Sequence, residues 1–163
     1  MSRAATPAIA ALLAAGVPHE VLRYHHDTRA ESFGEEAVAA LAGDGLVPDQ
    51  IFKTLIISAG STLAVAVLPV PYKLSLKAAA AALGLSKATM ADQAAAERAT
   101  GYVLGGISPL GQRKRLPTVI DSSALAFERV ACSAGKRGWD VALAPENLVA
   151  LTHAVAADIR VLG

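Results

Sequence analysis

Lys53 is the side chain whose position most clearly suggests chemistry. It follows Phe52 and opens an apolar, β-rich segment that continues to Ala59. A lysine at such a position most often lays its alkyl stem along apolar surface and keeps its ammonium group in water. The alternative is a cation held at the floor of a pocket and directed at a phosphate or a carbonyl group. The side chain of Thr54 is expected on the opposite face, although its backbone N–H could reach the same pocket.

Paired glycines form a second candidate, in the string Gly105-Gly106-Ile107-Ser108-Pro109. Glycines let a backbone turn sharply and approach a ligand, and two N–H groups brought close in this way can hold a developing oxyanion. An ordinary tight turn closed by proline is the more common meaning of such a string. The glycine spacing does not match a P-loop, so a nucleotide-binding loop is not indicated.

A basic segment lies between two expected strands, just before Asp140. A hairpin loop with solvated basic residues is the simpler interpretation. The functional interpretation is a cationic lip on which RNA phosphates rest, formed by Lys136 and Arg137, with Ser133 and Asp140 facing inward. The run Arg113–Arg115 could extend this lip, although three charges in a row usually form only a solvated loop.

Neither the histidines nor the cysteine indicates a separate centre. In the string His25-His26-Asp27, adjacent side chains would point apart, and a polar loop is the preferred interpretation. Cys132 lies in an apolar segment with no obvious neighbour to lower its thiol pKa, so a buried structural thiol is expected. The sequence has no G-x-S-x-G elbow, no zinc-site spacing and only one cysteine. No metal or cofactor is therefore indicated.

The elements that would position these residues mix helices and strands without a regular βαβ rhythm. Helices are expected over 7–15, 35–41, 75–83, 92–99, 122–127 and 145–153, and strands over 19–24, 53–59, 63–70, 101–104, 118–120, 129–133 and 139–143. A polar loop is expected over 25–34, and turns at 60–61 and 134–138 would make two antiparallel hairpins. We therefore expect an α+β fold: one domain over 1–163, with a curved, mixed, mainly antiparallel sheet or partial barrel surrounded by helices.

Composition narrows the function classes. The chain has 163 residues, 53% of them hydrophobic, which suits one domain with one core. A formal net charge of +1 argues against a protein that coats nucleic acid through a broad basic surface, but it permits a local basic patch. The apolar N-terminal stretch resembles a helix capped by Thr6 and begun by Pro7, rather than a signal peptide. No apolar run approaches the roughly 20 residues that span a bilayer, and a cytoplasmic protein is expected.

Several strings, taken in order, resemble the YbaK family of Cys-tRNA(Pro) deacylases. They are Arg23–Asp27 (RYHHD), Glu31–Gly34 (ESFG), Phe52–Leu55 (FKTL), Leu63–Val67 (LAVAV), Met90–Asp92 (MAD), Thr100–Pro117 (TGYVLGGISPLGQRKRLP) and Ser133–Asp140 (SAGKRGWD). The resemblance implies a free-standing relative of the editing domain inserted in many bacterial prolyl-tRNA synthetases. Such synthetases attach cysteine or alanine to tRNA(Pro), because a pocket cannot easily reject a side chain of similar or smaller size by binding alone.

The resemblance also implies roles for individual residues. Lys53 would be the key cation, contacting the terminal nucleotide and its ester, and Gly105 and Gly106 would complete the catalytic group. The aminoacyl and adenosine pocket would be lined by Tyr24, Phe33, Thr54, Ile107, Ser108, Ser133 and Asp140, and Lys136 and Arg137 would meet the tRNA backbone. No protein nucleophile is implied, since the substrate's own thiol attacks its carbonyl and releases a cyclic thiolactone.

The implied partners are the acceptor end of aminoacylated tRNA(Pro) and, in a transient complex, prolyl-tRNA synthetase. Two alternatives stay open at this point. One is an Ala-tRNA(Pro) deacylase that uses a solvent water. The other is a non-catalytic module that docks on tRNA or on a synthetase.

Overall fold

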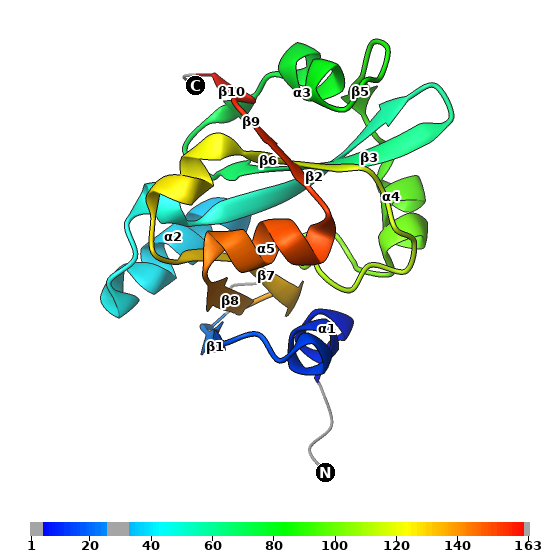
Figure 1. Ribbon diagram of the computed structural model, residues 1–163. Helices are drawn as coiled ribbons and strands as arrows, with labels where there is room; N and C mark the ends of the chain where they lie inside the picture. Colours follow the sequence, from blue (N-terminus) through cyan, green and yellow to red (C-terminus); the bar gives the residue numbers. More distant parts are fainter. Residues whose placement is uncertain (1–4, 26–32, 162–163) are drawn as a thin grey trace.

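The computed structural model describes residues 5–25 and 33–161 of the chain, in which helices surround two principal sheets (Figure 1). The helices are α1 (Pro7–Ala15), α2 (Phe33–Leu41), α3 (Leu76–Ala82), α4 (Gln93–Thr100) and α5 (Pro145–Thr152), with short 3-10 turns at Ala42–Asp44, Pro48–Gln50 and Ser122–Ala126. The strands are β1 (His19–Arg23), β2 (Phe52–Ala59), β3 (Thr62–Pro69), β4 (Lys73–Leu74), β5 (Thr89–Met90), β6 (Thr118–Asp121), β7 (Val130–Lys136), β8 (Trp139–Leu143), β9 (Val155–Ala157) and β10 (Arg160–Val161). The expected α+β class with mixed sheets is confirmed.

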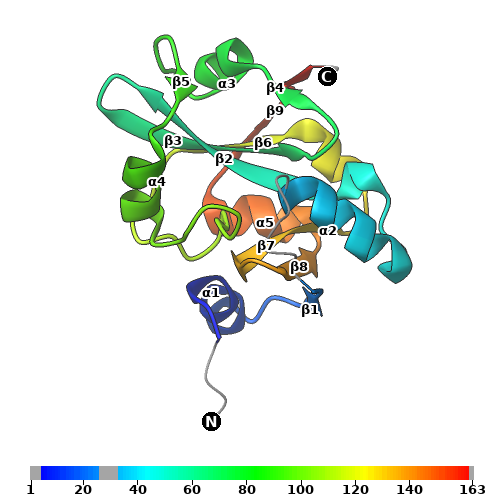
Figure 2. The ribbon, with the colours of Figure 1, turned by 180° about the vertical axis from the view of Figure 1, so that it is seen from behind.

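The strands divide between a five-stranded sheet, ordered β5-β2-β3-β6-β9, and a three-stranded sheet, ordered β1-β8-β7. The β2–β3 and β7–β8 hairpins are antiparallel, whereas β6 runs parallel to β3 and to β9. A single parallel bridge between Ile51 and Ala131 joins the two sheets at the beginning of β2. This junction brings the first residues of β2, including Lys53, to the β7–β8 hairpin. Figure 2 shows the two sheets from behind.

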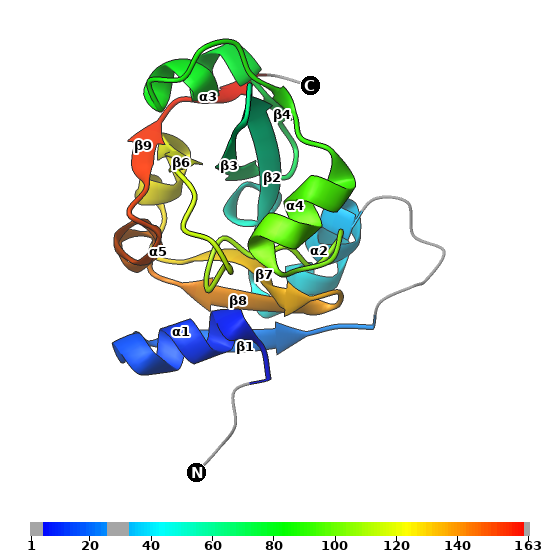
Figure 3. The ribbon, with the colours of Figure 1, turned by 90° about the vertical axis from the view of Figure 1, so that its right-hand side faces the viewer.

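Three apolar clusters hold the layers together. Helix α1 lies beneath the three-stranded sheet, where Leu12 packs with Val141 and Cys132 (Figure 3). Helix α2 covers the other face of that sheet through Leu41. Helix α3 packs its alanines, among them Ala79, against the five-stranded sheet. Alanine suits this position because a helix without long side chains can approach a sheet closely.

The local signals predicted several elements correctly. Thr6 caps α1 by accepting a hydrogen bond from the N–H of Ile9, and Gly16 ends the helix in the left-handed region. Ser75 and Asp92 cap α3 and α4 in the same way. Each of these caps depends on residues close in sequence, so the pattern was sufficient.

The structure contains no helix long and apolar enough to span a membrane among the residues it describes.

The strand expected over 101–104 is wrong. Gly101 ends α4 with φ +82°, and Leu104 donates its N–H to the Glu97 carboxylate at 2.8 Å. The N–H of Gly106 in turn donates to Val103 at 2.9 Å. The N–H groups of Leu104 and Gly106 are therefore bonded to a helix side chain and to the loop itself, and not to a neighbouring strand.

Two other boundaries differ from expectation. Helix α2 begins at Phe33 rather than at residue 35, so Phe33 and Gly34 are helical and not in a polar loop. Strand β7 continues to Lys136 through an irregularity after Ser133, and the turn is shorter than the expected 134–138. Gly135 makes this possible, since its φ of +103° is a conformation that favours glycine. Residues 26–32 of the expected loop, among them His26 and Asp27, lie outside the described residues.

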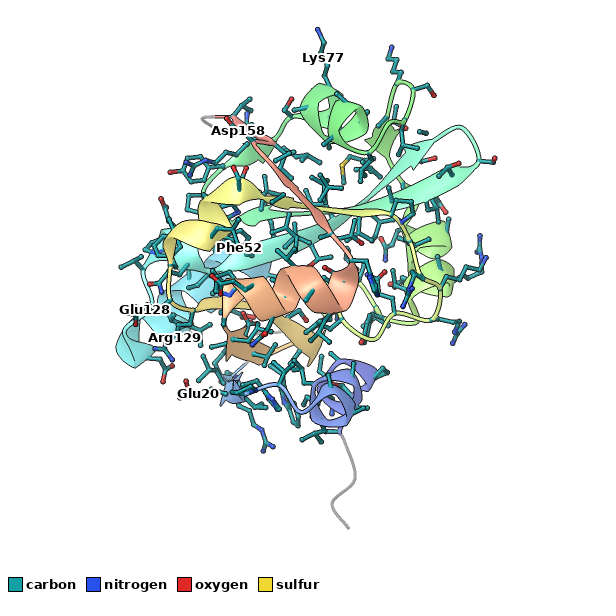
Figure 4. The ribbon with its side chains drawn as sticks, viewed as in Figure 1. Glu20, Phe52, Lys77, Glu128, Arg129 and Asp158 are labelled. Carbon is teal, nitrogen blue, oxygen red and sulfur yellow. The ribbon has the colours of Figure 1, made fainter. Side chains whose placement is uncertain are left out.

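Asp121 provides a test of what holds the C-terminal segment in place. Its carboxylate is 1% exposed and accepts hydrogen bonds from the N–H groups of Ile159 (2.9 Å) and Ser123 (3.1 Å), with Arg160 3.6 Å away. Asp121→Ala should lower the free energy of unfolding by about 2–4 kcal/mol in urea titrations, because buried donors and a cation lose their acceptor. Glu128→Ala is the matched control, since this carboxylate is exposed at the molecular edge (Figure 4) and its loss should cost less than about 0.5 kcal/mol. Equal losses in the two variants would contradict this account.

Candidate functional site

A cavity of about 320 Å³ opens where β2, α2, the loop after α4 and the β7–β8 hairpin meet. Eight of the residues singled out from the sequence line it: Tyr24, Phe33, Lys53, Thr54, Gly105, Ile107, Ser133 and Asp140. The cation at the start of β2 and the double-glycine loop therefore face one space, although they are about fifty residues apart in the chain. Because Lys53 and Gly105 line the same cavity, both can act on one bound group.

Lys53 enters the cavity half-buried, as the second residue of β2. Its ammonium group donates one hydrogen bond, to the carbonyl oxygen of Val70 at 3.2 Å. Burial lowers the pKa of Lys53 from its ordinary value, because desolvation disfavours the charged form. None of the described carboxylates forms an ion pair with it. The ammonium group keeps donors available for an anionic or carbonyl oxygen.

Asp140 is a nearly buried carboxyl group on the cavity wall. It is 5% exposed and stands opposite Ser133 in the β7–β8 register. Burial raises its pKa to about 7. Burial also raises the pKa of the neighbouring Tyr24 hydroxyl, and the negative charges of Asp140 and Glu36 add to that rise. No described cation pairs with Asp140. A buried acid without such a partner is costly to the fold, and groups of this kind are concentrated at functional sites.

Two kinds of polar group at the cavity lack partners within the described part of the chain. The Thr54 hydroxyl oxygen is buried without a hydrogen bond. The amides of Gly105 and Ile107 make no hydrogen bond there either, whereas the Gly106 amide donates to Val103. The Thr54 oxygen is closed to solvent, whereas Gly105 and Ile107 are partly exposed at the cavity, so their amides are the donors open to a polar ligand.

The double glycine has a packing reason as well. A Cβ on Gly105, whose φ is +86°, would lie 2.9 Å from the ring of Phe33. A Cβ on Gly106 would lie 3.2 Å from the backbone nitrogen of Arg137. A side chain at Gly105 would therefore clash with the start of α2, and one at Gly106 would press against the β7–β8 turn. Gly106 shapes the loop but does not line the cavity.

The remaining predicted residues lie at or behind the rim. Ser108 is fully buried, and its hydroxyl accepts a hydrogen bond from the N–H of Leu110 at 3.2 Å, so it stabilises the loop rather than lining the cavity. Lys136 and Arg137 are exposed on the hairpin. Arg137 donates to the carbonyl oxygen of Leu104 at 2.7 Å, and its guanidinium carbon is 5.0 Å from the Phe33 ring centroid. Arg137 thus links the hairpin to both sides of the cavity mouth.

Cys132 is buried behind the site, as the sequence predicted. It is 0% exposed, and burial raises its thiol pKa, so the thiolate needed by a nucleophile is disfavoured.

Several lining residues were missed from the sequence: Gly34, Glu35, Ala37, Ile51, Val70 and Leu104. Most are apolar, and they reach the cavity through the pairing of β2 with β3, the start of α2 at Phe33 and, for Leu104, the loop after α4.

Comparison with known proteins gives three findings. The profile of the aminoacyl-tRNA editing domain matches residues 31–151. A curated relative, EbsC of Enterococcus faecalis (strain ATCC 700802 / V583), is 40% identical over 116 residues, which cover 71% of this chain and 71% of EbsC. The name of EbsC proposes a Cys-tRNA(Pro)/Cys-tRNA(Cys) deacylase activity for that protein.

Two solved structures share the fold. A scaffold protein from computational epitope grafting superposes with a TM-score of 0.80 at 25% identity, covering 99% of each chain. A protein described as a candidate trans-editing enzyme for prolyl-tRNA synthetase superposes with a TM-score of 0.79 at 22% identity, covering 98% of this chain and 99% of the other.

Proposed function

The chain belongs to the aminoacyl-tRNA editing family, and from this premise we propose that it removes cysteine wrongly attached to tRNA(Pro). The family makes it an aminoacyl-tRNA deacylase, an enzyme that cleaves the ester between an amino acid and the terminal ribose. The identity of the amino acid and the chemistry of cleavage are our proposal. We place the reaction in the cytoplasm, with the acceptor end of charged tRNA as partner and prolyl-tRNA synthetase as a transient one.

The observation that carries the proposal is a set of polar groups around one small cavity, of which the Asp140 carboxylate and the amides of Gly105 and Ile107 have no partner within the described residues. An aminoacyl ester presents a cationic α-ammonium group, a carbonyl oxygen and nearby phosphate and ribose oxygens. The cavity presents the complementary groups: the Asp140 carboxylate, the amides of Gly105 and Ile107, and the Lys53 ammonium group. The apolar remainder of the lining leaves room for a small side chain.

Each group then has a defined task. Asp140 holds the α-ammonium group, which also provides a countercharge that no described residue gives its buried carboxylate. Lys53 and the two amides face the carbonyl oxygen, on which negative charge develops as the ester breaks.

Bond cleavage needs no nucleophile from the protein. The cysteine sulfur of the substrate forms a bond to its own carbonyl carbon, the bond from that carbon to the ribose oxygen breaks, and the thiol proton ends on the ribose hydroxyl. The products are a cyclic thiolactone and uncharged tRNA. Holding the thiol near its carbonyl makes attack intramolecular, and positioning of this kind contributes large rate enhancements.

A panel of charged tRNA(Pro) substrates tests the amino acid and the mechanism together. Cys-tRNA(Pro) should be deacylated. Ser-tRNA(Pro) should react at least about 100-fold more slowly, because a hydroxyl is a far weaker nucleophile than a thiol. Ala-tRNA(Pro), which has no side-chain nucleophile, should be equally poor. Rates are read as loss of labelled amino acid from tRNA. Release of alanine as fast as cysteine would contradict thiol-assisted cleavage and indicate attack by water, and no release from any of the three would contradict an editing activity on tRNA(Pro).

A further inference from the structure

Trp139 lies at the start of β8 with a cation on each neighbouring strand. Its register partners are Arg23 of β1 and Lys136 of β7. The guanidinium carbon of Arg23 is 4.1 Å, and the Lys136 ammonium nitrogen 4.8 Å, from the indole centroid. These three side chains, here called the cationic row, run across the three-stranded sheet as cation, ring and cation.

The cationic row and the cavity lie on opposite faces of the β7–β8 hairpin, near its turn. Neighbouring residues of a strand point to opposite faces, so Trp139 faces away from Asp140, which lines the cavity. Figure 3 shows the β7–β8 turn and the end of β1 together at one side of the molecule, below α2. Arg137, in the turn itself, reaches back to Phe33 at the cavity mouth. A chain leaving the cavity over Arg137 would therefore meet Lys136 and Trp139 next.

Packing alone does not explain the cationic row. Arg23 and Lys136 are both exposed, and none of the described carboxylates pairs with either of them. Trp139 is half-buried against the apolar core, and a cation stacked on such a ring contributes about 0.5–2 kcal/mol. With a net charge of only +1 for the whole chain, these two residues and Arg137 concentrate positive charge at one edge.

We propose that the cationic row binds the single-stranded nucleotides that precede the terminal nucleotide of a charged tRNA. The proposal rests on the proposed function, because it places the terminal nucleotide in the cavity. Unpaired bases stack on aromatic rings and on arginine planes, and phosphates bind lysine and arginine, so a row of cation and ring matches both parts of a nucleotide. An acidic peptide would use the cations but not the flat indole surface.

The chain carries its own probe for this contact, because Trp139 is its only tryptophan. An uncharged RNA hairpin with a single-stranded 3′ extension should change the intrinsic fluorescence saturably, and the same hairpin without the extension should not. By fluorescence anisotropy of labelled RNA, Trp139→Ala should weaken binding about tenfold, as expected for loss of one stacked base. Arg23→Gln and Lys136→Gln should each lower the slope of log Kd against log salt by about 0.7.

The double variant Arg23→Gln/Lys136→Gln alters only exposed side-chain ends, so it tests the cationic row even if Trp139→Ala destabilises the sheet. Lys77→Gln is the matched control, because Lys77 points outward from α3 at the opposite end of the molecule (Figure 4) and should bind RNA like the wild type. Equal affinity for the two RNA hairpins would overturn the inference. Wild-type RNA affinity in both Trp139→Ala and the double variant Arg23→Gln/Lys136→Gln would also overturn it.

Binding is measured here on uncharged RNA, so its failure is distinguishable from failure of the proposed function. A protein that deacylates Cys-tRNA(Pro) while its row variants bind RNA normally overturns this inference alone. A protein that binds the extension through the cationic row but cleaves no aminoacyl ester supports the inference and overturns the proposed deacylation.

Discussion

Lys53→Ala is expected to abolish deacylation of Cys-tRNA(Pro) while leaving the fold intact. The ammonium group makes one hydrogen bond, to Val70, and is half-buried at a cost that appears in its lowered pKa. Its removal should therefore change the free energy of unfolding by no more than about 1 kcal/mol. Removing one preorganised donor for a developing oxyanion typically costs about 10²–10³ in rate. The loss of a full positive charge should be at least as large.

Lys53→Met separates the charge from the packing, since it keeps an unbranched stem of similar length and removes the ammonium group. Single-turnover rates on Cys-tRNA(Pro) and thermal melts of both variants, beside Lys77→Ala as an exposed control, make the measurement. Methionine should be as inactive as alanine at this position. Normal turnover in Lys53→Met would show that the stem alone matters and would remove the cation from the mechanism.

The parts of the fold that could be predicted from the sequence are those set by neighbouring residues. Thr6, Ser75 and Asp92 cap their helices as expected because a cap joins positions three apart. The β2–β3 hairpin followed from two β-rich runs separated by Gly60 and Ser61. In contrast, the short strand β9 pairs parallel with β6, and that contact has no local signal.

The loop after α4 shows why the remainder could not be predicted. Its apolar residues, Val103 and Leu104, have β-forming character, yet 56% and 43% of their surfaces are exposed. The chain is diverted by Gly101 and held by the Glu97 carboxylate, a contact seven residues from Leu104. Propensity is a weak guide where a side chain from another element captures a backbone donor.

The site shows the same division. The family resemblance supplied the residue types, but the partner of each group could be seen only in three dimensions. Of the paired glycines, Gly106 uses its amide within the loop, and the amides without an acceptor in the described part of the chain belong to Gly105 and Ile107. The single bridge between Ile51 and Ala131 holds the start of β2, and with it Lys53, next to the β7–β8 hairpin. No local sequence pattern predicts this bridge.

Asp140→Asn is expected to stabilise the protein and to impair it as an enzyme. The folded-state pKa of Asp140 is raised to about 7, from an ordinary value of 3.8, by burial. Between these two values the unfolded chain has lost the proton and the folded chain has kept it. The folded state therefore binds more protons, and its stability falls as the pH rises from about 4 to about 7, then levels off. Asparagine has no such penalty, so at pH 8 the variant should melt about 3–10 °C higher than the wild type, at about 2–4 °C per kcal/mol.

Ionisation of Asp140 lowers stability as the pH rises, but it should raise the rate of catalysis over the same pH range. Only the carboxylate form can hold the α-ammonium group of the substrate, so the wild-type advantage in kcat/KM over Asp140→Asn should grow as the pH rises through about 7. Taking the ratio of the two enzymes at each pH cancels the titration of the substrate's own amine and thiol. Thermal melts and single-turnover rates from pH 5.5 to pH 8 on the same preparations give both curves. A variant that melts lower than the wild type at pH 8 would show that Asp140 is satisfied by the fold itself. If the carboxylate destabilises the empty protein in the pH range where it raises activity, the two results together would support the proposed binding of the substrate's α-ammonium group by Asp140.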